Sequence, residues 1–149
     1  MKLELKHLAP YLPYGLKMIF EGKGGRILEI TGLRVAGNSE KTSNLLYFNS
    51  ISETLSCVYF KPILRPISDL CNYFDYLYEV SEDKNIKDFL DESFLQDKGI
   101  DSWEELVFTE VNYIPYGTLQ VLFEYHFDIF GLIEQGLAIS IHDVGQVIT

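Results

Sequence analysis

The chain has 149 residues, of which 47% are hydrophobic and 23% are charged, and its formal net charge is −10. This length fits one domain better than two, and the hydrophobic content excludes a disordered chain. We therefore predict a single compact domain over residues 1–149. Ten tyrosines raise the aromatic content to 14%, which suits the edge of a core, a pocket wall or an interface, because tyrosine packs like a core residue and keeps a polar tip.

The N-terminal 60 residues have the pattern of a small antiparallel sheet. Pro10 and Pro13 prevent a long helix, so we predict one helical turn near residues 5–8 followed by an extended stretch. A glycine-rich turn at residues 21–25 joins two strand-like runs into a hairpin. The strand-like runs, in chain order, are residues 16–20, 26–31, a short segment after Gly32, 45–48 and 57–60.

The second half of the chain, residues 67–135, is predicted to be mostly helical. Residues 61–66 contain a proline pair and are expected to be an extended connection. Ser68 or Asp69 could cap a short helix, and apolar residues recur at helical spacing between residues 86 and 94, before Gly99. Ser102 and Glu105 match a capping box.

Pro115 is well placed to begin another helix. The residues after it are apolar almost all round, which predicts a central buried helix. Residues 137–141 alternate enough to form a closing strand that rejoins the N-terminal sheet. The fold class is therefore predicted to be α+β: a small N-terminal antiparallel sheet, β-rich over residues 1–60, packed against a C-terminal helical half.

No established catalytic motif is present in the sequence. Gly22-Lys23-Gly24 lacks the Ser or Thr that a phosphate-binding Walker A loop requires, so a hairpin turn is the better interpretation. Cys57 and Cys71 are not close enough in sequence to form a zinc motif. We predict no metal site and no cofactor.

His126 and Asp128 are the candidate catalytic residues, because a histidine and a nearby carboxylate can act as base and orienting group. His142 and Asp143 form the other close pair. The alternative for His126 is a hydrogen-bonded core histidine, and the alternative for His142 is a surface residue at the end of a strand.

The negative charge is concentrated in one segment. Residues 75–110 contain twelve Asp and Glu against three Lys, a net charge of −9. Such a segment repels nucleic acid and favours basic protein partners. The alternative interpretation is a solvated surface without a partner, which has the same acidic composition. The acids that could project from helices toward a protein partner are Asp88, Asp91, Glu92, Glu104 and Glu105.

Neither a signal peptide nor a membrane helix is expected. The first residues become polar too early for a signal peptide, and the longest apolar run, residues 119–133, is interrupted by Glu124, His126 and Asp128. We predict a cytoplasmic protein with both thiols reduced and without membrane contact.

Three blocks of the sequence resemble a family of small uncharacterised proteins from phages and prophages of Bacteroidetes. The blocks are residues 5–17 (LKHLAPYLPYGLK), 60–70 (FKPILRPISDL) and 125–139 (YHFDIFGLIEQGLAI). The resemblance implies a phage origin and a location in the cytoplasm of a bacterial host. It implies no enzymatic activity and no catalytic residues. The polar or amphipathic residues of these blocks that we single out are His7, Tyr11, Tyr14, Lys61, Arg65, His126 and Asp128.

The sequence leaves several functions open. The leading hypothesis is a non-enzymatic phage accessory protein that binds a protein, either a host protein or a second copy, through the acidic segment 75–110. A narrower form makes it an inhibitor whose acidic helices imitate a phosphate backbone. The alternatives are a small enzyme with a His/Asp site and a homo-oligomeric structural component of the phage.

Overall fold

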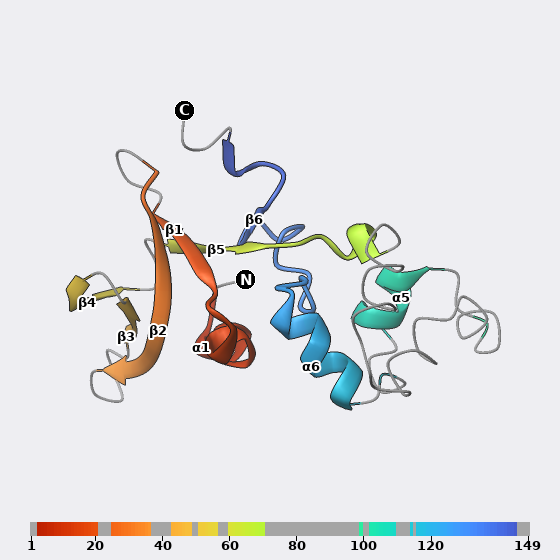
Figure 1. The fold of residues 1–149 in the computed structure, drawn as a ribbon, viewed down its shortest axis with the longest axis horizontal. Coiled ribbons are helices and arrows are strands. Elements are labelled where there is room, and N and C mark those ends of the chain that lie inside the picture. The colour runs from red at the N-terminus through yellow and green to blue at the C-terminus, as the bar shows by residue number, and fades with distance from the viewer. Residues whose placement is uncertain are drawn as a thin grey trace. The chain divides into compact units, whose positions relative to one another are not determined.

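The computed structural model describes residues 3–20, 25–36, 43–48, 51–56, 60–70, 99, 102–109, 114 and 116–145. Its secondary structure is α+β, as the sequence predicts. The chain divides into two compact units (Figure 1). Unit 1 comprises Met1–Leu64 and Leu132–Thr149, and unit 2 comprises Arg65–Gly131. That the whole chain acts as one domain stays a prediction.

Unit 1 contains a six-stranded sheet with the strand order β4-β3-β2-β1-β5-β6. All neighbouring strands are antiparallel except β5 and β6, which are parallel. The strands are β1 (Lys17–Phe20), β2 (Ile27–Ala36), β3 (Ser43–Phe48), β4 (Ile51–Ser56), β5 (Phe60–Leu64) and β6 (Ile139–Ser140).

The core of unit 1 is centred on β1, which lies between β2 and β5. Met18 and Ile19 are consecutive in β1 and both are fully buried, so both faces of this strand are covered, because successive side chains point to opposite faces. Phe20 lies opposite Phe60 in β5, and their ring centroids are 5.3 Å apart. Cross-strand aromatic pairs of this kind stabilise a sheet and fix its register.

Helical turns, rather than an extended stretch, precede β1. The predicted turn is present as α1 (Leu5–Leu8), but the 3₁₀ helix η1 (Ala9–Tyr14) follows it directly. The expectation of an extended stretch was wrong because the fixed φ of proline is compatible with a 3₁₀ helix. Gly15 ends η1 with φ +67°, and a Cβ there would lie 3.2 Å from Glu29 Oε1, so both conformation and space favour glycine.

The strands of unit 1 differ from prediction in their boundaries. The hairpin of β1 and β2 is confirmed, but β2 continues through Gly32 to Ala36 where we expected a separate short strand. A register shift between Ile30 and Gly32 accounts for the apparent break, since a bulge lets a strand continue while its pairing slips. Strand β4 was not predicted, and Pro62 did not prevent the presumed connection from becoming β5.

The predicted closing strand is confirmed in a shorter form. Strand β6 pairs with β5 through Ile63 opposite Ile139 and Leu64 opposite Ser140. Parallel neighbours cannot be joined by a tight turn and need a crossover connection. Here the chain between them contains the whole of unit 2.

Unit 2 contains η3 (Ile67–Asp69), α5 (Trp103–Phe108) and α6 (Tyr116–Glu124). These elements share a buried cluster made of Ile67, Leu70, Leu106, Val107, Ile114, Leu122, Phe127 and Ile129. The predicted helix over residues 86–94 lies outside the described residues. Gly99 has φ +67°, the left-handed conformation that glycine adopts without a steric penalty.

The prediction of a central buried helix after Pro115 was wrong, because α6 is buried on one side only. Thr118 and Leu122 are buried, whereas Tyr116, Gln120 and Glu124 are exposed. Residues four apart lie on one line along a helix, so α6 has a buried line and an exposed line. Most of its apolar residues therefore sit at the boundary between the two, partly buried against the core cluster.

Candidate functional site

Three of the residues singled out from the sequence meet in unit 2. The backbone N–H of Arg65 donates to the carbonyl of His126 at 2.8 Å, and the N–H of Asp128 donates to the carbonyl of Arg65 at 2.9 Å. Together these bonds form a parallel bridge between Arg65 and Phe127. The candidate catalytic pair therefore flanks a buried phenylalanine and is fixed to Arg65 through the backbone.

The side chain of Arg65 contacts Asp69 and Phe127. Its Nη1 lies 3.8 Å from Asp69 Oδ2, and its guanidinium carbon lies 5.9 Å from the centroid of the Phe127 ring. The Arg65 and Asp69 side chains are 17% and 14% exposed, so water screens this ion pair less than a surface pair. Phe127 is fully buried. The contact with Phe127 joins the residue before Pro66 and η3 to the segment that follows α6, and the ion pair joins Arg65 to the last residue of η3.

His126 ends α6 in the left-handed conformation, with φ +62°. Its N–H donates to the Phe123 carbonyl at 3.0 Å, and the Phe127 N–H donates to the Leu122 carbonyl at 2.9 Å. This pair of bonds is the Schellman motif that ends many helices, in which the left-handed residue is usually glycine. Phe127 and Leu122 also belong to the same buried cluster, and a hydrophobic contact between these two positions often accompanies the motif. The backbone of His126 therefore has a clear structural role.

Asp128 is the most buried acidic residue described, with 3% of its surface exposed. A carboxylate at such a position is costly to ionise unless polar or charged groups stabilise it. His126 is half-buried. The structure places the two residues on either side of Phe127, and their roles as catalytic base and orienting group stay a prediction.

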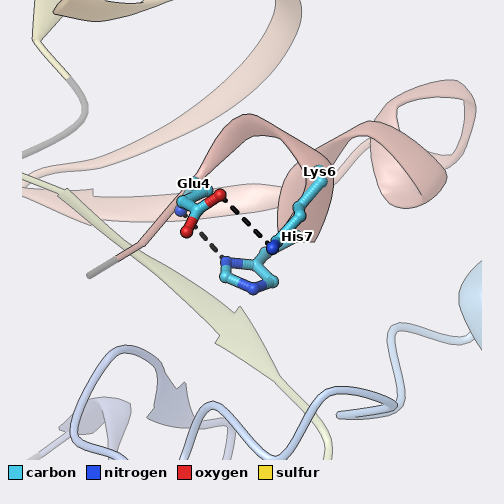
Figure 2. Close-up of polar contacts among 3 residues, drawn as sticks. All are labelled: Glu4, Lys6 and His7. Carbon is cyan, nitrogen blue, oxygen red and sulfur yellow. Dashed lines mark hydrogen bonds and ion pairs between the residues drawn. The ribbon is translucent and has the colours of Figure 1, made fainter. Parts of the chain in front are cut away.

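The other histidines belong to unit 1. His7 is buried and is the third residue of α1. Its Nδ1 accepts a hydrogen bond from the Glu4 N–H at 3.0 Å (Figure 2). The His7 N–H donates to the Glu4 carbonyl at 3.0 Å. Because a backbone N–H always donates, Nδ1 carries a lone pair and the proton of the neutral ring is on Nε2.

Burial lowers the pKa of His7 below its ordinary value of 6.5. The carboxylate of Glu4 raises this pKa and the ammonium of Lys6 lowers it, both by less than burial does. Glu4 and Lys6 also form an ion pair, with 3.4 Å between Oε2 and Nζ (Figure 2). Both side chains are well exposed, so this pair contributes little to stability.

His142 and Asp143 are exposed, as expected for a strand end. The N–H of His142 donates to Ser140 Oγ at 3.2 Å, and the N–H of Asp143 donates to the Ser140 carbonyl at 2.9 Å. Both bonds stabilise the turn after β6. Among the described residues, no group of three or more His, Cys, Asp or Glu side chains could hold a metal ion.

Two of the five acids proposed for partner binding are described. Glu104 and Glu105 form the first turn of α5, and Ser102 caps this helix by accepting from the Glu105 N–H at 3.1 Å. The Ser102 half of the predicted capping box is therefore confirmed. Asp88, Asp91 and Glu92 lie outside the described residues.

Among the described residues of unit 2, three aromatic residues that were not predicted as site residues are exposed. Phe108 is 40% exposed on α5, Tyr116 is 75% exposed on α6, and Phe130 is 36% exposed after α6. The signal that could have identified Tyr116 was its position four residues before Gln120 and eight before Glu124, two polar residues on the same line of the helix.

Comparisons of this α+β chain with known proteins found no match. No family model, no curated protein and no solved structure matches it. None of the described helices has the length and apolar character required to cross a membrane.

Proposed function

We propose that the chain is a non-enzymatic phage accessory protein that binds another protein through the outer surface of unit 2. The observation that carries the proposal is the position of Phe108, which is 40% exposed on the same helix as Glu104 and Glu105. The resemblance of the chain to phage and prophage proteins suggests that the binding partner is in a bacterial host cell.

The geometry of α5 gives Phe108 two acidic neighbours. Glu104 and Glu105 precede it by four and three residues, and side chains at these spacings are adjacent on a helix surface. Leu106 and Val107 are buried in the core cluster and fix the opposite side of the helix. Helix α5 therefore carries an exposed aromatic ring flanked by two half-buried acidic side chains.

An exposed ring between carboxylates favours a cationic partner. The face of an aromatic ring attracts Lys and Arg side chains, and the carboxylates add ion pairs. Nucleic acid is disfavoured because the chain has a net charge of −10. Exposed aromatic residues are enriched at protein interfaces, so a protein with a basic surface fits this helix best.

The test is capture from a lysate of the bacterial host with tagged full-length protein, a salt-gradient wash and mass spectrometry. We expect wild type to retain one host protein in stoichiometric amount. The α5 double variant, Glu104→Gln with Glu105→Gln, should release the host protein at a lower salt concentration than wild type does. Phe108→Ser should retain much less of the host protein. Glu134→Gln, which neutralises an exposed acid of unit 1, is the matched control.

Two outcomes would overturn the proposal. Recovery of the tagged protein alone removes the support for a host partner. Equal release by Glu134→Gln and by the α5 double variant would show that bulk charge, and not α5, retains the bound protein. Circular dichroism of each variant establishes that it is folded before the comparison is made.

A further inference from the structure

We propose that the exposed line of α6, which we call the outer ridge and define as Tyr116, Gln120 and Glu124, is the docking site for a basic amphipathic segment of the partner. This inference rests on the proposed protein-binding function and extends it from α5 to a second helix of the same unit.

The orientation of the outer ridge is fixed by the opposite side of the helix. Thr118 and Leu122 are four residues apart and buried, and Leu122 belongs to the core cluster. The outer ridge has the same spacing on the other side, and all three of its residues are exposed. Tyr116 is 75% exposed, which is the largest exposed fraction among the large hydrophobic residues described.

An aromatic pair adds apolar surface on the same side of α6. Phe123 follows Tyr116 by seven residues, or about two helical turns, so it lies near the same line. Its ring centroid is 6.0 Å from that of Phe130, with 36° between the ring planes. Phe123 packs against the core cluster while Phe130 stays 36% exposed. The pair can therefore contact apolar side chains of a partner without a rearrangement of the core.

The charge at the end of this ridge selects a basic occupant. Glu124 is the last residue of α6, and the last turn contains no basic residue. The C-terminal end of a helix carries a partial negative charge, so Glu124 adds to a field that is already negative. An acidic segment or a nucleic acid would be repelled there, whereas Lys or Arg beside apolar residues would complement Glu124 and the rings.

The experiment measures binding of a defined probe by fluorescence anisotropy. The probe is a labelled 15-residue peptide of Leu and Lys with an amphipathic helical pattern, and the comparison peptides are its scrambled form and a Leu/Glu form. We expect full-length wild type to bind the amphipathic Leu/Lys peptide more tightly than either comparison peptide. Tyr116→Ser should weaken this binding about tenfold, the size expected for an aromatic anchor.

Two further variants separate the ridge from general effects. Glu124→Gln should weaken binding and reduce its salt dependence, because one ion pair is lost. Ile141→Ser removes a 44% exposed apolar side chain from unit 1 and should leave binding unchanged. Thermal unfolding of every variant shows whether a loss of binding reflects a loss of structure.

The inference is overturned if Tyr116→Ser binds the peptide as wild type does, or if the scrambled peptide binds equally well, since bulk charge would then suffice. Self-association in sedimentation velocity that Tyr116→Ser abolishes would assign the ridge to a second copy instead. If Tyr116→Ser changes nothing while the α5 variants still lose the host protein, this inference fails and the proposed function stands.

Discussion

His126 and Gly136 occupy equivalent positions in two turns with the same hydrogen-bond pattern. His126 has φ +62° and Gly136 has φ +73°. In each turn the left-handed residue donates to the carbonyl three positions earlier, and the next residue donates to the carbonyl five positions earlier. The second turn uses the glycine that this geometry favours, whereas the first holds a histidine there.

The first prediction concerns this histidine. His126→Gly should leave the free energy of unfolding unchanged or raise it by up to about 1 kcal/mol, because glycine adopts the left-handed conformation without the penalty of an L side chain. His126→Val should lower it by about 1–2 kcal/mol, since a β-branched residue is poorly accommodated there. Urea denaturation monitored by tryptophan fluorescence measures both changes.

Gly136→Ala is the matched control and should destabilise the protein by about 1 kcal/mol, because its φ is unfavourable even though a Cβ would have space. If His126→Gly instead lowers stability by more than about 1 kcal/mol, the imidazole makes contacts that matter beyond helix termination. Such a result would favour a role for the side chain of His126.

The second prediction is a pH dependence at His7. Because its pKa is lowered in the folded protein, the unfolded chain binds the proton first as the pH falls below about 6.5. The contribution of neutral His7 to stability is therefore fully present above pH 6.5 and is lost progressively as the pH falls toward the folded-state pKa. Protonation also places a proton on Nδ1, where it opposes the Glu4 N–H.

His7→Gln separates titration from capping. A glutamine at this position of a helix can accept the same backbone N–H through its side-chain oxygen, and it does not titrate. We expect similar stability for the variant and wild type at pH 7.5, and a growing advantage for the variant between pH 6.5 and 5. Parallel urea curves across this range would contradict the assignment.

The third prediction concerns the cap of α5. Ser102→Ala removes the side chain that accepts from the Glu105 N–H and should lower the free energy of unfolding by about 1 kcal/mol. Ser102→Asp keeps an acceptor and should preserve most of the stability. Hydrogen exchange of the α5 amides would show whether the loss is local. An unchanged exchange rate in Ser102→Ala would mean that tertiary packing alone holds this helix.

The fourth prediction concerns Thr118, which is 1% exposed. Its Oγ1 has no hydrogen-bond partner among the described residues, and burying a hydroxyl without a partner is unfavourable. Thr118→Val has nearly the same shape and should be neutral or stabilising by roughly 1 kcal/mol. Thr118→Ala should be destabilising, because it leaves a small cavity. A clear loss of stability in Thr118→Val would show that the hydroxyl is hydrogen-bonded in the protein.

Local patterns predicted the elements that depend on neighbouring residues. The hairpin of β1 and β2, the turn α1 and the Ser102 cap all follow from side chains within a few positions of one another. The 3₁₀ helix η1 was missed because proline restricts φ but does not choose between extended and 3₁₀ conformations.

Burial on α6 depended on what the helix packs against. Its sequence is apolar on most sides, yet the core cluster of unit 2 covers only the side that carries Thr118 and Leu122. Sequence periodicity shows which side chains lie along one line of a helix, but it does not determine how much of the helix surface other elements bury. The spacing of Tyr116 from Gln120 and Glu124 was a partial signal of its exposure, but only the packing of α6 on the core cluster decided which side of the helix is covered.

The sequence by itself determined the α+β class, the acidic charge and the local caps and turns, because composition and short-range hydrogen bonding decide them. The tertiary structure alone decided that β6 pairs in parallel with β5, across a connection that contains all of unit 2. It also decided that Arg65 forms a β-bridge with Phe127, through backbone hydrogen bonds to His126 and Asp128, although the bridged residues are far apart in the sequence. Long-range pairing depends on which surfaces the whole chain can bury together, and no local pattern encodes that choice.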